Sequence, residues 1–135
     1  VQPRRVTHAV LRTAQLDAMR RFYTEVGGLE VVYENEQVVY LRAGLANYDY
    51  SLILVRDAEA SFSHGSFELA SVQDLEQTLE RLKARNITPV HDVNLPWKRA
   101  FFLRDPDGLL SEWYVTLAGD RVLDSNHSLP LWAQV

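Results

Sequence analysis

The stretch VTHAVL at residues 6–11 returns in a related form, FSHGSF, at residues 62–67. In each copy the histidine, His8 or His64, stands at the same point of a short run that is typical of a β-strand. Other segments match as well, since LDAMRRFY occupies the place of VQDLEQTL and YLRAGL resembles FLRDPDGL. This internal similarity indicates a duplicated module.

The first half of the chain is predicted to fold in the order β-α-β-β-β. A strand over residues 5–11 precedes an amphipathic helix over residues 14–26, whose apolar residues recur at helical spacing. Gly27 and Gly28 end that helix. Three strands are then expected over residues 29–33, 38–42 and 48–55.

The second half repeats this order. A strand is predicted over residues 62–69, and Ser71 with Asp74 forms the capping-box-like start of a helix that ends near Asn86. Three more strands are expected over residues 87–90, 99–104 and 109–116. The patterns therefore predict a duplicated α+β domain with one module over about residues 5–56, a second over about 61–117, and a C-terminal tail over 118–135.

Composition narrows the class of protein. The 135 residues suit a single domain, and 47% apolar with 24% charged residues is typical of a soluble globular protein. A net charge of −4 without a block of Lys or Arg argues against nucleic acid or an anionic membrane as the partner. The absence of cysteine excludes disulfides, thiolate metal sites and cysteine nucleophiles. No apolar run approaches a membrane span and no signal peptide is visible, so a cytoplasmic location is expected.

The stretch RDPDGLLSEWYV, residues 104–115, contains an acidic residue within a mostly apolar run. Asp105 to Gly108 has the composition of a turn, and the β-like run after it carries Glu112 in its middle. A carboxylate in a half-buried strand is costly unless a cation or hydrogen bonds compensate it. Glu112 is therefore expected to have a partner.

A metal ion is one such partner. If the two modules pack side by side, the strand faces that carry His8 and His64 meet, and the last strand brings Glu112 to the same point. Two imidazoles and one carboxylate form a facial triad that suits a divalent ion and leaves coordination positions open.

The chain resembles the vicinal oxygen chelate superfamily, which includes glyoxalases, extradiol ring-cleaving dioxygenases, fosfomycin-modifying thiol transferases and bleomycin-binding proteins. The resemblance spans about residues 5–116 and is carried by VTHAVL, FSHGSFEL and, most specifically, FFLRDPDGLLSEWY. It implies two tandem βαβββ modules that form a cupped, barrel-like mixed sheet around a metal site. It also implies a homodimer, which the apolar tail favours too.

Within the superfamily, glyoxalase-type isomerases use a fourth protein ligand from the last strand of module one. Matching DYSLILV to LLSEWYV places Leu52 opposite Glu112, and leucine cannot bind a metal. The three-ligand enzymes, dioxygenases and fosfomycin transferases, are therefore favoured. The fosfomycin pattern has a Thr after the first ligand and a Ser/Gly-rich loop, whereas this chain has HAV and HDVNLPWKRAFF, although Lys98 and Arg99 could meet an anionic group.

The resemblance to extradiol dioxygenases has two departures. Their pattern expects a Tyr where Phe102 stands and a His at about residues 93–95, which would act as acid/base. His91 is close to that place but off register, and His127 in the tail is a second candidate.

An aromatic pocket is predicted beside the metal. Its candidate residues are four on strands and one on a loop: Tyr40, Tyr50, Phe102, Tyr114 and Trp97. Aromatic walls suit a planar or apolar substrate, and ordinary core packing is the competing interpretation.

The favoured hypothesis is a metal-dependent enzyme like the extradiol dioxygenases, which acts on a small aromatic or vicinal-oxygen substrate. Fe(II) is the favoured ion, with Mn, Ni or Zn as alternatives. The alternative functions are a non-redox isomerase, lyase or thiol transferase with the same triad, or a small-molecule binding or resistance protein.

Overall fold

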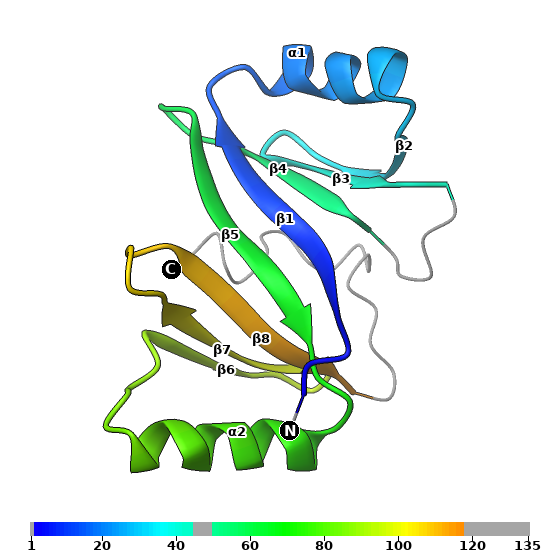
Figure 1. The fold of residues 1–135 in the computed structure, drawn as a ribbon. Helices are drawn as coiled ribbons and strands as arrows, with labels where there is room; N and C mark the ends of the chain where they lie inside the picture. Colours follow the sequence, from blue (N-terminus) through cyan, green and yellow to red (C-terminus); the bar gives the residue numbers. More distant parts are fainter. Residues whose placement is uncertain (1, 45–49, 118–135) are drawn as a thin grey trace. The chain divides into compact units, whose positions relative to one another are not determined.

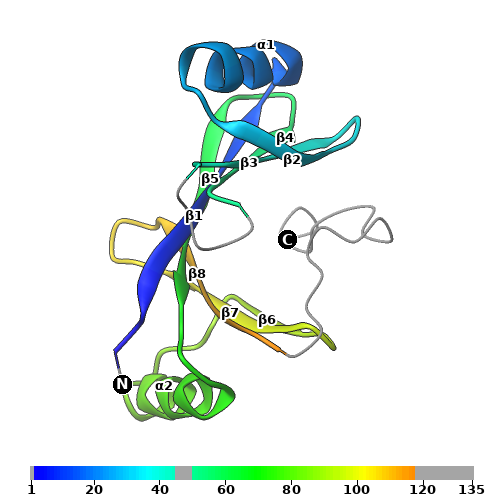
Figure 2. The ribbon, with the colours of Figure 1, turned by 90° about the vertical axis from the view of Figure 1, so that its right-hand side faces the viewer.

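The computed structural model describes residues 2–44 and 50–117. Their elements follow the predicted order twice (Figures 1 and 2). These elements are β1 (Arg5–Thr13), α1 (Leu16–Arg21), the π-helix η1 (Phe22–Val26), β2 (Glu30–Glu34), β3 (Val38–Arg42), β4 (Leu52–Arg56), β5 (Ser61–Glu68), α2 (Val72–Ala84), β6 (His91–Asn94), β7 (Lys98–Arg104) and β8 (Leu110–Thr116). The prediction of an α+β chain with two βαβββ modules is confirmed.

The described residues divide into two compact units. Residues 7–44 and 50–63 form the N-terminal unit, and residues 2–6 with 64–117 form the C-terminal unit. No helix within the described parts of the chain is long and apolar enough to cross a membrane.

In the N-terminal unit the strands lie in the order β2-β3-β4-β1. β1 runs parallel to β4, and β3 runs antiparallel to both β2 and β4. Helix α1 covers one face of these strands (Figure 1). The core between helix and strands is apolar and consists of Leu16, Val39, Leu41 and Leu54, with Leu11, Met19 and Tyr23 packed against it.

The C-terminal unit repeats this arrangement with β5-β8-β7-β6. β5 runs parallel to β8, and β7 runs antiparallel to β8 and β6. Helix α2 covers one face, as Figure 2 shows, over a core of Leu69, Leu75, Phe101 and Val115. The Ser71 hydroxyl accepts a hydrogen bond from the Asp74 N–H at 3.1 Å, which confirms the predicted helix start.

The helix expected over residues 14–26 is wrong in one respect, because its second half is a π-helix. There the Gly27 N–H donates to the Phe22 carbonyl, five residues back, at 3.0 Å. A Cβ on Gly27 would lie 2.8 Å from the Tyr23 oxygen, so this close approach requires glycine. The helix ends at the predicted glycine pair, and Gly28 has a φ of 76°.

The strand expected over residues 87–90 is also wrong, since the strand lies at His91–Asn94. Pro89 has no N–H to contribute to a strand ladder, and the pairing with β7 begins at His91 opposite Phe102. The strand expected over 48–55 begins at Leu52, and residues 48 and 49 lie outside the described part.

The predicted turn at Asp105–Gly108 is confirmed. The Gly108 N–H donates to the Asp105 carbonyl at 2.8 Å, and Asp105 Oδ1 accepts the N–H groups of Asp107 and Leu109, both at 2.9 Å. Gly108 has a φ of 86°, in the left-handed region. This turn fixes where β8 starts and therefore which of its side chains face which side.

Replacing Gly108 by alanine should destabilise the protein by about 1 kcal/mol, because a side chain disfavours a left-handed backbone. No atom lies within 4 Å of a Cβ built there, so the effect is one of backbone conformation alone. Gly44→Ala is the matched control, since its Cβ also meets open space and its φ is not positive. Urea unfolding of both variants measures the difference, and equal stabilities would contradict the expectation.

Candidate functional site

The pairing register divides the C-terminal unit into two faces. Directly paired residues share a face, so Ser66, Glu112, Phe102 and His91 form a row across β5, β8, β7 and β6. The intervening residues, such as Phe101, face α2. The row therefore lies on the face away from α2, and His64 shares this face because it stands two residues before Ser66.

Glu112 is held at both of its carboxylate oxygens. The Ser66 hydroxyl donates to Oε1 at 2.8 Å, and the Lys98 ammonium donates to Oε2 at 2.7 Å. The Glu112 side chain is only 2% exposed. The predicted need for compensation is thus met in this structure by a lysine and a serine.

Lys98 is itself nearly buried, with 11% of its side chain exposed. Its ammonium lies 4.7 Å from the centre of the Tyr114 ring, a cation–π distance. Lys98 was not predicted from the sequence as the partner of Glu112. The available signal was its spacing, because Lys98 stands four residues before Phe102 and so shares the pleat face of Phe102 and Glu112.

The histidines of the C-terminal unit both contact Phe102. The His64 ring is fully buried and lies edge-on to Phe102, with 5.1 Å between the ring centres. His91 is half-buried, and its ring centre lies 6.0 Å from that of Phe102. Phe102 thus links the ring of a predicted metal ligand to the ring of a predicted acid/base.

The N-terminal unit places His8 among aromatic side chains. His8 is buried, and its Nδ1 lies 3.0 Å from the Thr7 hydroxyl. Its ring centre is 4.8 Å from that of Tyr50, which in turn is 5.1 Å from that of Tyr40. The structure therefore brings together a predicted ligand and two residues predicted to line a substrate pocket.

The strand pairing within each unit corrects the predicted alignment of Leu52 with Glu112. Val10 pairs with Ile53, and Ile53 pairs with Tyr40, just as Ser66 pairs with Glu112 and Glu112 with Phe102. Since Val10 and Ser66 each follow a histidine by two residues, the counterpart of Glu112 is Ile53. The match of Leu52 with Glu112 was wrong by one residue. Ile53 is fully buried and cannot bind a metal, so the absence of a ligand at that position still holds.

Three further residues were predicted for the site: Tyr114, Trp97 and His127. Tyr114 is buried beneath Lys98. Trp97 is half-buried just before β7, and its carbonyl accepts a hydrogen bond from the Leu117 N–H at 2.9 Å. His127 lies outside the described residues.

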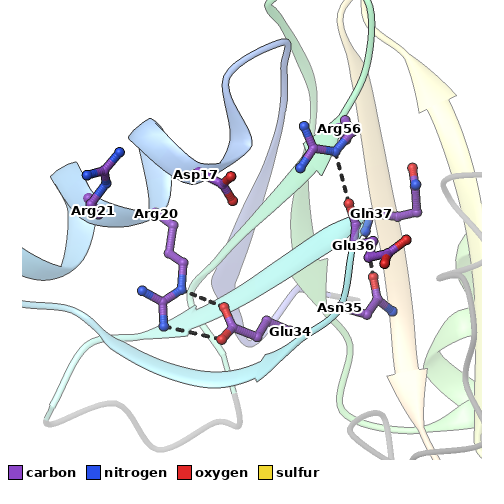
Figure 3. A pocket seen from close by; sticks show the side chains of 8 residues that line it. All are labelled: Asp17, Arg20, Arg21, Glu34, Asn35, Glu36, Gln37 and Arg56. Atoms are coloured by element: carbon purple, nitrogen blue, oxygen red, sulfur yellow. Dashed lines mark hydrogen bonds and ion pairs between the residues drawn. The ribbon is translucent and has the colours of Figure 1, made fainter.

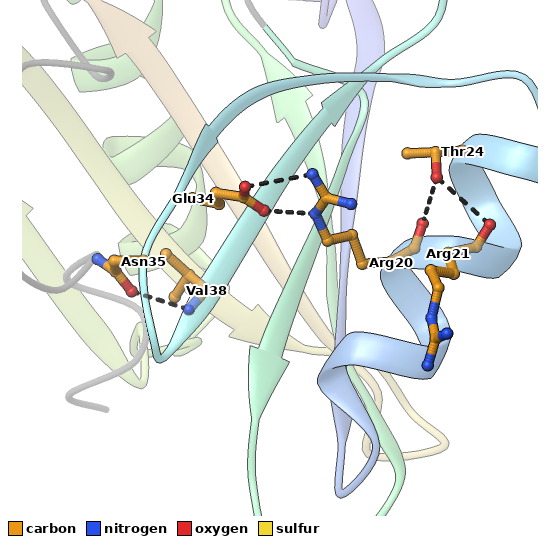
Figure 4. Close-up of polar contacts among 6 residues, drawn as sticks. All are labelled: Arg20, Arg21, Thr24, Glu34, Asn35 and Val38. Atoms are coloured by element: carbon orange, nitrogen blue, oxygen red, sulfur yellow. Dashed lines mark hydrogen bonds and ion pairs between the residues drawn. The ribbon is translucent and has the colours of Figure 1, made fainter.

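A separate, open pocket of about 910 Å³ lies in the N-terminal unit (Figure 3). None of the predicted site residues lines it; its lining consists of Asp17, Arg20, Arg21, Glu34, Asn35, Glu36, Gln37 and Arg56. The Arg20 guanidinium donates two hydrogen bonds to Glu34 (Figure 4), and their lengths are 2.5 and 3.2 Å. This contact raises the pKa of Arg20. Arg56 donates to the Glu36 carbonyl at 2.9 Å. These internal contacts engage Arg20, Glu34 and Arg56, and we assign the pocket no ligand.

The chain belongs to the glyoxalase/bleomycin resistance protein/dioxygenase superfamily, whose family model matches residues 5–113. Among curated proteins it is 29% identical over 116 residues to biphenyl-2,3-diol 1,2-dioxygenase 3 of Rhodococcus globerulus, which covers 80% of this chain and 61% of that protein. It is also 28% identical over 121 residues to a probable lactoylglutathione lyase of Vibrio parahaemolyticus, over 80% of this chain and 88% of that protein. The chain thus spans about three fifths of the length of the biphenyl-diol dioxygenases that it matches.

Solved structures share the fold. A variant of homoprotocatechuate 2,3-dioxygenase from B. fuscum superposes with a TM-score of 0.76 at 22% identity, over 93% of this chain and 36% of that one. The anaerobic complex of the same enzyme with 3,4-dihydroxyphenylacetate gives a TM-score of 0.74 at 23% identity, over 88% of this chain and 38% of that one. At such identities the likeness is one of fold alone.

Replacing Glu112 by glutamine should destabilise the metal-free protein by about 3 kcal/mol, because it leaves the nearly buried Lys98 ammonium without a counter-charge. Glu76→Gln is the control, since Glu76 pairs with Arg99 at 3.3 Å on the surface, and its loss should cost less than about 1 kcal/mol. Urea unfolding in the presence of a chelator measures both. Equal losses would contradict a buried ion pair at Glu112.

Proposed function

We propose that this chain is a divalent-metal-dependent enzyme of the extradiol dioxygenase type. His8, His64 and Glu112 are its metal ligands, Fe(II) is its ion, and a small aromatic diol is its substrate. The observation that carries the proposal is the buried Glu112 carboxylate, held at both oxygens on the sheet face of His64, in a chain of this family.

The donor chemistry fits a divalent ion. The three proposed ligands are two imidazoles and one carboxylate, all of them buried. This set suits Fe(II) and leaves positions open for substrate. Metal-binding histidines are usually oriented by a hydrogen bond at the second ring nitrogen, and the Thr7 hydroxyl beside His8 Nδ1 is such a partner. Nε2 is therefore the proposed donor atom of His8.

Other residues of the chain would bind and orient the substrate. Tyr50 packs against His8 and Tyr40 against Tyr50, while Phe102 packs against His64, so aromatic surface adjoins each proposed imidazole ligand. Tyr114 and Trp97 are proposed as further walls of the same pocket. A bound metal ion would lower the pKa of the diol hydroxyls as a Lewis acid.

A general acid/base is also needed to take and return the diol protons. His91 is one proposed group, because it lies in the same row as Phe102 and Glu112 and is half-buried rather than enclosed. His127 in the tail remains the other candidate.

A dioxygenase is favoured over an isomerase by two observations. The relatives include two biphenyl-2,3-diol dioxygenases, and Ile53 stands where a fourth ligand of the glyoxalase type would come from. The likeness to a probable lactoylglutathione lyase over most of that protein's length supports a second candidate, a non-redox isomerase or lyase with Ni or Zn in the same triad. A homodimer and a cytoplasmic location remain predictions of the sequence.

One assay separates the two candidates. Protein loaded anaerobically with Fe(II) and mixed with catechol or 2,3-dihydroxybiphenyl should form a yellow ring-cleavage product when air is admitted, followed by absorbance. Protein loaded with Ni or Zn should not isomerise the hemithioacetal of methylglyoxal and glutathione. The reverse pattern would favour the isomerase and refute the dioxygenase.

His64→Ala and Glu112→Gln should each lose retained metal, because each removes one of three proposed ligands. His91→Ala is the matched control, since it deletes an imidazole from the same sheet face without touching the triad, and it should retain metal. Elemental analysis of protein purified without chelators measures the content, and circular dichroism confirms the fold. Full occupancy in both ligand variants would contradict the assignment.

A further inference from the structure

The ammonium of Lys98 occupies an unusual place for a lysine. It is enclosed between the Glu112 carboxylate and the face of the Tyr114 ring, and little of its side chain reaches solvent. Lysine side chains normally extend their charge into water, so this enclosure requires strong compensation. Glu112 provides it through a charge-assisted hydrogen bond.

Lys98 is the counter-charge of Glu112, because neighbouring charged side chains pair with other residues. A second carboxylate on this face, Glu68 of β5, is paired with Arg5 at 2.9 Å. The neighbouring cation on β7, Arg99, projects to the opposite face and pairs with Glu76. Glu68 and Arg99 thus have partners other than Glu112 and Lys98.

We propose that Lys98 is a built-in counter-cation of the metal site, which sets the charge of the substrate that the site accepts. This inference rests on the proposed function, since it takes Glu112 as a metal ligand. In the metal-free protein Lys98 neutralises and orients Glu112. Once a divalent ion binds the same carboxylate, one negative charge faces both cations, and the site carries an excess of positive charge.

Two consequences follow from Coulomb's law. Lys98 weakens the binding of any divalent cation at Glu112, because two cations at one carboxylate repel each other. It also adds positive charge to the site, so it favours a substrate that brings negative charge over a neutral one. Lys98 is therefore a positioning residue for Glu112 and a specificity residue for the anion.

The decisive variant is Lys98→Gln, which keeps a donor for Glu112 Oε2 and removes the charge. Arg99→Gln is the matched control, because it removes the same charge one residue away on the opposite face. Zn(II) serves as a redox-inert probe, with its affinity measured by competition with a chromophoric chelator. Lys98→Gln should bind Zn(II) at least about tenfold more tightly than the wild type, and Arg99→Gln should differ by less than about twofold.

A second arm tests the charge of the substrate. Catechol and 4-nitrocatechol, a far more acidic diol that is largely anionic at neutral pH, are titrated against the Zn(II)-loaded proteins. The wild type should prefer the anionic probe, and Lys98→Gln should reduce the ratio of the two affinities at least about fivefold. Lys98→Arg keeps the positive charge and should restore the preference for the anionic probe. Both measurements are repeated on Lys98→Met, which also lacks a hydrogen-bond donor for Glu112 Oε2.

The outcomes are distinct. Equal or weaker Zn(II) affinity in Lys98→Gln, or an unchanged preference for the anionic probe, would overturn the role of Lys98 and leave the metal site standing. Failure of the wild-type protein to bind Zn(II), Fe(II), Mn(II) or Ni(II) would overturn the proposed function and this inference together.

Discussion

The carboxylate of Glu112 is buried and held from two sides, and the C-terminal unit is organised around that constraint. Ser66 comes from a parallel neighbour and Lys98 from an antiparallel one, so the contacts exist only when both strands pair in the observed register. A shift of one residue would turn Glu112 toward the apolar core under α2. The need to satisfy this charge therefore adds to the apolar packing in specifying how the strands align.

The sequence predicted those parts of the fold that depend on local chemistry. The Ser71 cap, the turn ending at Gly108 and the glycines that end the first helix each need only neighbouring residues. The π-helical half of that helix was missed because apolar spacing does not distinguish hydrogen bonds to the fourth and the fifth preceding residue. The misplaced strand was missed because Ile87 and Val90 suit a strand by type, whereas Pro89 between them cannot join the ladder.

The candidate site was predictable in its residue types and less so in its contacts. His8, His64 and Glu112 were expected inside strands, and all three are buried there. The contact between Lys98 and Glu112 depends on pairing between strands, which a single sequence fixes only weakly. The same weakness produced the error of one residue that put Leu52 in place of Ile53. Residues that act through a partner strand are thus the ones that sequence reasoning misses.

Ile53 stands at the position equivalent to Glu112, so only one of the two duplicated halves carries an acid there. Counting back four positions from Tyr40, as from Phe102 to Lys98, leads to the exposed Glu36. At these two positions the N-terminal half has Ile53 and Glu36, whereas the C-terminal half has Glu112 and Lys98. A chain assembled from two copies of the N-terminal half would contain neither the buried acid nor its counter-cation, so the two halves are not interchangeable.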